Sequence, residues 1–267
     1  MRYFSLIKAF ISMKYKTMLE YKAAFWAASV SQILYYSVDL LLLWVLVSKF
    51  QHLGSWNADE IILLYAFFLL TYALAGFFFF GCCNYLSDRI QSGQFDEALT
   101  LPVHPLFYEV FNHLTTDYIR HFVLALAFFI FAVVRLEISF NLIKIVLLIL
   151  NLLGGALIHA AAALFFSTPN LWLVKGTGIV DLFYYEALPF ISYPITIFPK
   201  IIQILMTFLL PYAFINFFPA QYFLGKSDFS IFSPAFQFLT PLVGVVAFAI
   251  SLWFFNRGLK RYQSTGS

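Results

Sequence analysis

The 267-residue chain is 62% hydrophobic and only 11% charged, whereas ordinary soluble domains carry about 25% charged residues. A water-soluble fold of this size could not bury that much apolar surface, so lipid must be the solvent for most of the chain. The net charge of +3 is too weak to indicate a nucleic-acid partner, and the basic residues near both ends suit anionic lipid headgroups instead. No polar stretch is long enough for a second core, which predicts a single domain over residues 1–267.

The N-terminal residues 1–22 mix apolar and basic side chains. Phe4, Ile7 and Phe10 recur at helical spacing, and Lys8 and Lys14 interleave with them. This pattern is typical of an amphipathic helix that lies in the membrane interface. The same lysines leave no apolar core before residue 23, so a cleavable signal peptide is not predicted.

Six apolar segments follow, each close to the roughly 20 residues that span hydrocarbon. They cover residues 23–47, 61–81, 115–134, 142–166, 178–197 and 231–255. The sequence therefore predicts an all-α fold, a polytopic membrane protein with six transmembrane helices. Small residues in the fourth segment, among them Gly154 and Gly155, favour close packing against another helix.

Residues 201–224 are also apolar and long enough to cross, but they contain Pro211 and Pro219. With six crossings and the N-terminus inside, eleven of the 16 Lys and Arg residues lie on the cytoplasmic side or its boundary, and five lie outside: Lys49, Arg135, Lys144, Lys200 and Lys226. A seventh crossing would move the basic C-terminus outside, against the positive-inside rule. We therefore predict a re-entrant or interfacial hairpin over residues 199–226 on the outer face, with both termini in the cytoplasm.

No pattern of catalytic or metal-binding residues is visible in the sequence. The five histidines lack an HExxH spacing, no Gly-x-Ser-x-Gly elbow occurs, and Cys82 and Cys83 have no further ligands nearby, so both are expected to be small packing residues. The run Gly225-Lys226-Ser227 imitates the end of a phosphate-binding loop, but Ala220 stands where that loop needs a glycine. The chain is therefore expected to be no enzyme, to hold no metal or cofactor, and not to bind ATP by itself.

Several polar side chains fall inside predicted crossings. Asp39 lies in the first, and Asp181, Tyr184, Tyr185 and Glu186 lie in the fifth. Intramembrane carboxylates are costly and usually face a cavity or a substrate path. Asp39, Tyr184, Tyr185 and Glu186 are therefore candidate pathway residues, while Asp181 is expected at the hydrated boundary.

Two further polar features have simpler interpretations. Asp117 and Arg120, three residues apart at the start of the third crossing, are expected to pair on one helix face. His159 could relay protons in mid-membrane, but a hydrogen bond to a neighbouring helix is the preferred interpretation.

A polar segment, residues 84–109, separates the second and third crossings and contains the sequence LSDRIQSGQFDEALTLPVHP at 86–105. Gly93 permits a tight bend after a short helix, Phe95 and Leu99 place two apolar anchors four residues apart on one face, and Pro102 stops the second short helix. A short amphipathic helix of this kind can seat in a groove of a partner.

This segment resembles the cytoplasmic loop of ABC-2-type permeases, in which an isoleucine, a glycine, an apolar–acidic pair, a leucine and a proline recur. Here they are Ile90, Gly93, Phe95, Asp96, Leu99 and Pro102. The proline-containing stretch 198–219 is similar to the outer hairpin of that family. The terminal residues 258–262, GLKRY, are similar to the short basic tail of its branch of six-helix subunits of about this length.

The resemblance implies the permease subunit of an ATP-driven exporter in the cell membrane, a bacterial plasma or inner membrane, which moves an amphiphilic or lipid-like substrate outward. Two permease subunits, identical or paralogous, would surround the pathway. Separate ABC ATPase subunits, which hold ATP and Mg, would dock at the inner face. The interfacial helix near residues 14–21 would help to couple them, together with eight loop residues: Asp88, Arg89, Ile90, Gly93, Phe95, Asp96, Leu99 and Pro102.

The sequence leaves two alternative functions open. An ion-coupled secondary transporter would titrate Asp39, His159 or Glu186, and would need inverted repeats with paired broken helices. A membrane enzyme acting on lipid would need a convergent cluster of acids or histidines. Neither pattern is visible in the sequence.

Overall fold

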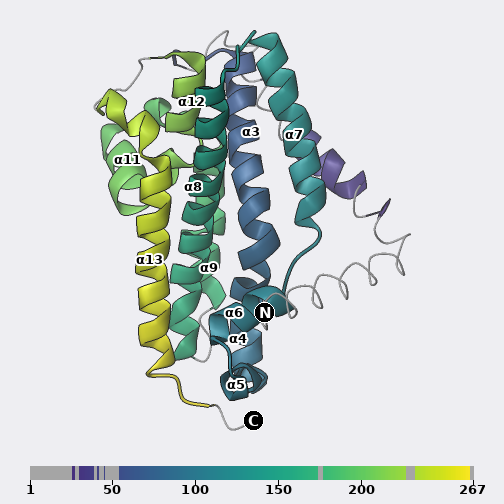
Figure 1. The fold of residues 1–267 in the computed structure, drawn as a ribbon, viewed down its shortest axis with the longest axis vertical. Helices are drawn as coiled ribbons and strands as arrows, with labels where there is room; N and C mark the ends of the chain where they lie inside the picture. The colour runs from purple at the N-terminus through teal and green to yellow at the C-terminus, as the bar shows by residue number, and fades with distance from the viewer. Residues whose placement is uncertain are drawn as a thin grey trace.

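The computed structural model describes residues 26–27, 30–38, 41, 45, 54–173, 177–226 and 232–264. The regular elements in these ranges are helices, which confirms the all-α prediction. Long upright helices form the body of the molecule, and shorter helices gather at both ends (Figure 1). The interfacial helix predicted for residues 1–22 and the candidate Asp39 lie outside the described residues.

Helices long and apolar enough to cross a membrane are fewer than predicted. Within the described residues there are four such stretches, and a pair of helices bent by 79° would make a fifth if it counts as one span. The four confirm the second, third, fourth and last predicted crossings, and six crossings are not confirmed. The stretches are Ala58–Gln91, Tyr118–Arg135, Leu142–Leu171 and Thr240–Leu259, and the bent pair is Lys200–Leu209 with Tyr212–Leu224.

The central helix is longer than the segment predicted for it. Asn57 and Glu60 exchange side-chain and backbone hydrogen bonds in a capping box, so the helix begins at Ala58 instead of residue 61. It then runs without a break into the polar segment, because no proline occurs before Gln91, and Gly76 and Gly81 both keep helical backbone angles. Its three parts are α3 (Ala58–Ala75), the π-helix η1 (Gly76–Phe80) and α4 (Gly81–Gln91).

Two glycines bring the next part of the chain against the π-helix. A Cβ atom on Gly76 would lie 2.4 Å from the ring of Tyr118, and one on Gly81 would lie 2.0 Å from the carbonyl oxygen of His113. The amide of Thr115 donates a hydrogen bond to the carbonyl oxygen of Phe77 at 3.1 Å. The linker at residues 113–117 is therefore held close to η1, and α7 (Tyr118–Arg135) rises from it beside α3.

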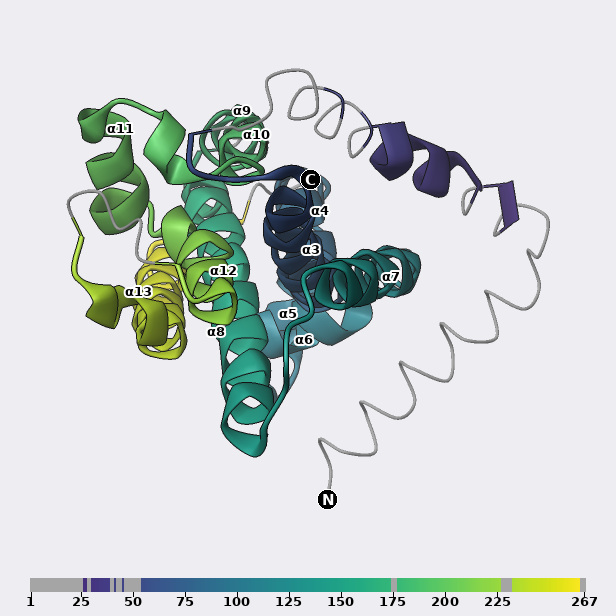
Figure 2. The same ribbon diagram turned by 90° about the horizontal axis from the view of Figure 1, so that it is seen from above.

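Small residues bring α8 (Leu142–Ser167) and α13 (Thr240–Leu259) into close contact. A Cβ atom on Gly244 would lie 2.3 Å from the carbonyl oxygen of Gly154, so only glycine fits at this crossing. The hydroxyl of Ser251 adds a hydrogen bond to the carbonyl oxygen of Ala161 at 2.8 Å. The predicted packing role of the small residues is thus confirmed. Seen from above, α8 lies between α13 and α3, with α7 on the far side of α3 (Figure 2).

The segment predicted as the fifth transmembrane helix is not one continuous helix. Proline lacks the amide hydrogen that helix continuation requires, and the segment contains Pro189 and Pro194. Pro189 stands in the first turn of a new short helix, and Pro194, with extended backbone angles, precedes the next one. The pieces are α9 (Thr177–Phe183), η3 (Tyr185–Ala187), α10 (Leu188–Ile191) and η4 (Ile195–Ile197).

The predicted outer hairpin is a sharply bent pair of helical segments at the end of the bundle opposite α4 (Figure 1). The bend lies at Pro211, and either a broken span or a re-entrant loop has this form, so the hairpin stays a prediction. Its parts, with the short helix that precedes α13, are α11 (Lys200–Ile204), η5 (Leu205–Leu209), η6 (Tyr212–Phe214), α12 (Phe217–Leu224) and η7 (Pro234–Phe238).

The sequence that imitates a phosphate-binding loop is the end of α12. Gly225 caps this helix with a φ of 63°, a left-handed conformation that glycine adopts without strain. The ammonium of Lys226 lies 2.6 Å from the carboxylate of Glu60 and so ties this end to the start of α3.

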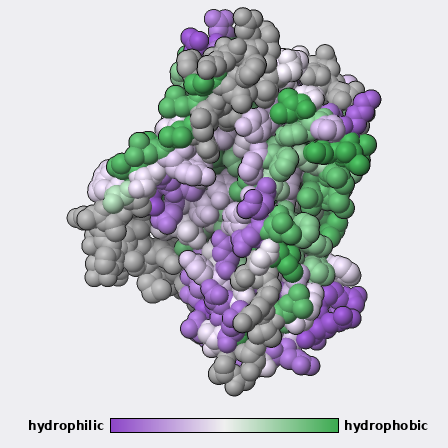
Figure 3. All heavy atoms as spheres, turned by 180° about the vertical axis from the view of Figure 1, so that it is seen from behind, coloured by the Kyte–Doolittle hydropathy of each residue, from purple (hydrophilic) through white to green (hydrophobic). Residues whose placement is uncertain are grey.

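The surface is polar at one end of the molecule and apolar along one side. The end that carries α4 and the C-terminal residues is mostly hydrophilic, whereas a tall hydrophobic band covers the side where α11 and α13 lie (Figure 3). Large apolar side chains of α13 are more than half exposed or nearly so, which fits contact with lipid. They are Leu242, Val245, Val246, Ile250 and Trp253.

Candidate functional site

The polar segment folds into a compact bend that we call the elbow, residues 84–113. It consists of the end of α4, a tight turn, α5 (Phe95–Thr100) and α6 (Pro105–Asn112). Gly93 takes a φ of 71° in the turn, so the tight bend predicted there is confirmed. Pro102 follows the end of α5 as expected, and the ring of His104 caps α6 by accepting a hydrogen bond from the amide of Leu106 at 3.2 Å.

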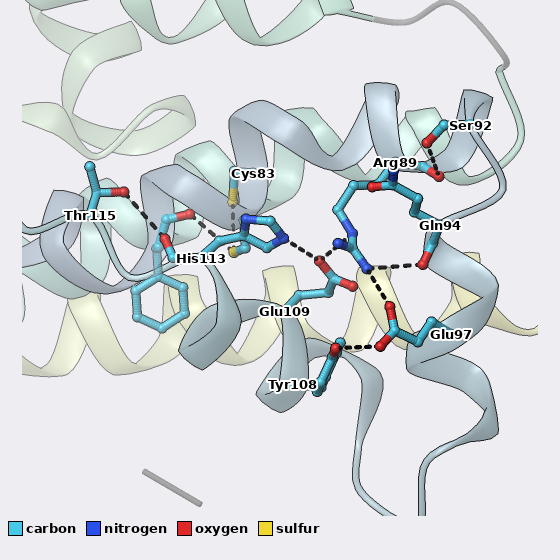
Figure 4. Close-up of polar contacts among 11 residues, drawn as sticks. Cys83, Arg89, Ser92, Gln94, Glu97, Tyr108, Glu109, His113 and Thr115 are labelled. Atoms are coloured by element: carbon cyan, nitrogen blue, oxygen red, sulfur yellow. Dashed lines mark hydrogen bonds and ion pairs between the residues drawn. The ribbon is translucent and has the colours of Figure 1, made fainter. Parts of the chain in front are cut away.

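A buried ion pair closes the elbow. The guanidinium Nε of Arg89 on α4 lies 3.1 Å from the carboxylate of Glu109 on α6, and the two side chains are only 9% and 2% exposed. The Nη2 group of Arg89 also donates to the carbonyl oxygen of Gln94 at 2.9 Å and lies 4.0 Å from the carboxylate of Glu97. Arg89 therefore joins α4, the turn, α5 and α6 in one set of contacts (Figure 4).

Further polar contacts extend this set in both directions. The Nε2 atom of His113 lies 3.5 Å from the same Glu109 oxygen, and the hydroxyl of Tyr108 donates to Glu97 at 2.9 Å (Figure 4). The role of Glu109 was not predicted. The signal for it was present, because Glu109 and His113 stand four apart in an otherwise apolar helix and so share one face.

Burial raises the pKa of Glu109 from its ordinary value near 4.5 to about 7, and Arg89 opposes the shift. The folded state therefore binds this proton more tightly than the unfolded state, and the contribution to stability is lost as the pH rises through about 7. We expect thermal stability in detergent, followed by tryptophan fluorescence, to fall between about pH 5 and pH 8. The neutral variant Glu109→Gln should remove this part of the slope, and an unchanged slope in Glu109→Gln would contradict the assignment.

The predicted apolar anchors do not face the same way. Phe95 is fully buried, and its ring packs against that of Tyr262, with centroids 5.2 Å apart. Leu99 is 44% exposed. The prediction that both face a partner was wrong for Phe95, because the buried face of this short helix is made by Phe95 and Ala98, and Leu99 points away from it.

The other predicted coupling residues divide in the same manner. Ile90 is buried with Arg89 on the inner face of α4, whereas Asp88 is exposed. The carboxylate of Asp96 is occupied by the chain itself, since it accepts a hydrogen bond from the hydroxyl of Tyr262 at 2.9 Å. An exposed apolar edge remains on the elbow. We call it the elbow tip, and it comprises Leu99, Leu101 and Pro102.

The predicted pathway residues do not form one cluster. Tyr184 is fully buried, and its hydroxyl lies 2.8 Å from Nδ1 of His159, which confirms the preferred interpretation of that histidine. The hydroxyl of Tyr185 donates to the side chain of Asn84 at 2.9 Å. Glu186 is exposed, as is Asp181. Among the described pathway candidates, the side chain of Glu186 is exposed and that of Tyr185 is partly exposed, whereas Tyr184 is buried.

The two remaining polar expectations concern an ion pair and the cysteines. Arg120 and Asp117 form the predicted ion pair at 2.7 Å, and Arg120 also donates to the side chain of Gln32 at 3.2 Å. Cys82 and Cys83 are buried free thiols at the start of α4, beside a small cavity bordered by Glu109. Among the residues that the structure describes, no three His, Cys, Asp or Glu side chains are placed to hold a metal ion.

A family model described as ABC-2 family transporter protein matches residues 33–266. The chain belongs to this family. No curated protein and no solved structure matches it. The match to the ABC-2 family takes in the elbow, the long helices and the tail that follows α13, and this chain is therefore a multi-pass membrane protein of the ABC-2 permease type.

Proposed function

We propose that the chain is the permease subunit of an ATP-driven ABC exporter. In this proposal it lies in the cell membrane with both termini in the cytoplasm and moves an amphiphilic or lipid-like substrate outward. A separate ABC ATPase subunit would bind ATP and Mg and supply the work, and a second permease copy or a paralogue would complete the pathway. Membership of the ABC-2 family supports the proposal.

The observation that carries the proposal is that the elbow is continuous with Ala58–Gln91, the longest helical stretch among the described membrane-span candidates. The stretch Ala58–Gln91 has 34 residues, about 50 Å of helix at 1.5 Å per residue. The Arg89–Glu109 pair holds the elbow against one end of this helix. Because Gly81 has no Cβ atom, the 113–117 linker packs closely against the side of the same helix. A push on the elbow would therefore act along a helix that passes through the centre of the bundle.

The elbow tip is the surface that we expect an ATPase subunit to contact. Leu99 and Leu101 are 44% and 36% exposed. They lie at the end of α5 (Figure 1), and we expect this hydrophilic end of the molecule (Figure 3) to face the cytoplasm. Exposed apolar side chains on a short, rigid helix suit a groove in a protein partner. Asp88 adds a charge on the neighbouring part of α4. The predicted coupling role of Phe95, Asp96 and Arg89 is then indirect, since these residues hold the tip in place.

Glu186 and Tyr185 are the pathway residues that the proposal retains. Both lie on the broken segment between α9 and α10, where backbone irregularity at membrane depth is tolerated only against protein or a cavity. A second permease copy opposite this segment would provide that cover. The aromatic and carboxylate groups there suit an amphiphilic cargo.

Co-purification tests the docking surface. An affinity-tagged wild-type chain, expressed in its own cells and extracted in mild detergent, should retain an ATPase that hydrolyses ATP. Leu99→Asp places a charge in the apolar contact and should lower the retained ATPase by at least about tenfold, as expected for loss of a central interface residue. The matched control is Gln94→Asp, an equally charged change at an exposed elbow residue away from the tip. Equal retention by both variants would contradict the tip as the docking surface.

A further inference from the structure

Residues 256–264 comprise the last turn of α13 and the C-terminal tail that follows it, and they contact the elbow at several points. The hydroxyl of Tyr262 donates to Asp96 at 2.9 Å, and its ring packs on Phe95. The amide oxygen of Asn256 lies 2.9 Å from Nε2 of His104, just before α6. Figure 1 shows the tail leaving α13 at the same end of the molecule as α5. Residues 166 positions apart in the sequence thus meet at the predicted coupling element.

The tail is continuous with a helix that is itself firmly held. Gly258, at the end of α13, lies against the 3-10 helix η2 (Thr168–Leu171) that directly follows α8, because a Cβ atom there would be 2.7 Å from Leu171 and 2.8 Å from Trp172. Higher up, Gly244 meets Gly154 and Ser251 bonds to α8. A movement of the tail would therefore be passed to α13 and α8 together.

The elbow is thus attached to the bundle from two sides. On one side Arg89 and the unbroken helix connect it to α3. On the other side Tyr262 connects it to α13 through the carboxylate of Asp96, which also accepts a hydrogen bond from the hydroxyl of Ser264. Burial and the hydrogen bond to Asp96 raise the pKa of Tyr262 to about 12, so the phenol remains a donor at physiological pH.

We propose that Tyr262 and Asp96 are positioning residues that make the elbow and α13 move as one unit. The inference rests on the proposed function in one respect, namely that the conformational change of the ATPase subunit moves the elbow. The movement of the elbow would then be transmitted to α8 and α13 as well as to α3. Phe95 and Asp96 of the elbow serve this attachment and do not form part of the ATPase-binding surface.

Spin-label distances test the attachment without any knowledge of the substrate. Labels are placed at exposed positions on the two parts and away from the elbow tip, Gln94→Cys at the start of α5 and Lys260→Cys on the tail, with Cys82 and Cys83 replaced by alanine. We expect one narrow distance distribution by pulsed electron resonance. In the complex that retains its ATPase, the distribution should stay the same when ATP is added, because the two parts move together.

Variants of the tail should loosen the attachment according to how much of the Tyr262 interaction each one removes. Tyr262→Phe keeps the ring and should raise the detached population about tenfold, the effect of one hydrogen bond to a carboxylate. Tyr262→Ala removes the ring as well and should broaden the distribution further, and Asp96→Asn, which keeps an acceptor, should change it least. Gln263→Ala is the matched control at an exposed neighbouring residue and should behave as wild type.

The outcomes separate this inference from the proposed function. A distance that shifts on ATP addition to the wild type, or one that Tyr262→Ala leaves unchanged, would overturn the attachment. In the complex, Tyr262→Ala should retain the ATPase but lose most of the ATP-driven flipping of a fluorescent phospholipid in vesicles; flipping at the wild-type rate would overturn its role. A wild-type chain that retains no ATPase would instead overturn the proposed function, and the narrow distribution would still report the contact.

Discussion

Replacing Gly81 by alanine should destabilise the protein by about 2–3 kcal/mol, the upper part of the range for overpacked sites. The added Cβ atom would lie 2.0 Å from the carbonyl oxygen of His113 and 3.1 Å from its carbonyl carbon. Both are backbone atoms, so no side-chain rotation relieves the clash, and the 113–117 linker must move away from α4. That movement would also disturb the nearby contact between His113 and Glu109.

Thermal unfolding with a fluorogenic thiol reagent measures this effect at fixed pH. The chain has two cysteines, Cys82 and Cys83, and both are buried next to Gly81, so their labelling reports the opening of this region. The control is Gly178→Ala, because a Cβ atom there meets nothing within 4 Å. We expect a lowered midpoint for Gly81→Ala alone. Equal midpoints for the two variants would show that the linker does not press on α4.

Removing the buried carboxylate should have a still larger effect. Glu109→Leu leaves the guanidinium of Arg89 buried without its main counter-charge, which costs about 3–5 kcal/mol in comparable sites. Arg89→Met should cost less, although it also loses the bond to the Gln94 carbonyl. The asymmetry arises because Glu109 can take up a proton near neutral pH, whereas arginine cannot lose one.

The double variant Arg89→Met/Glu109→Leu completes the cycle. Because apolar side chains of similar size can replace a buried ion pair, it should be more stable than Glu109→Leu alone. The measurement is the same thermal midpoint, with ATPase retention as a second readout of the elbow shape. A larger loss in Arg89→Met than in Glu109→Leu would contradict the view that the unpaired arginine is the costly species.

Much of the elbow could be predicted from local sequence. Gly93 takes the left-handed turn that only glycine makes cheaply, and α5 ends before Pro102. The pair formed by Asp117 and Arg120 follows from their spacing alone. These features depend on backbone sterics and on neighbours within one helical turn. Both can be inferred from the order of the residues alone.

Other features of the site could not be predicted in this way. Phe95 and Leu99 share an apolar character, but a helix of six residues has no intrinsic inner face. The partner that buries Phe95 is Tyr262, far along the chain. Glu109 offered a similar difficulty: its spacing from His113 indicated a contact within α6, but nothing in the local sequence placed Arg89 beside it.

Composition and hydropathy alone determined that this chain is a helical membrane protein, because transfer of apolar side chains from water to lipid is roughly additive and needs no knowledge of neighbours. Spacing within one turn determined the bend, the caps and the family motif. Only the tertiary structure decided which motif residues face outward and that the tail holds α5. Those outcomes depend on contacts between residues distant in sequence, whose energies exist only once the helices have packed.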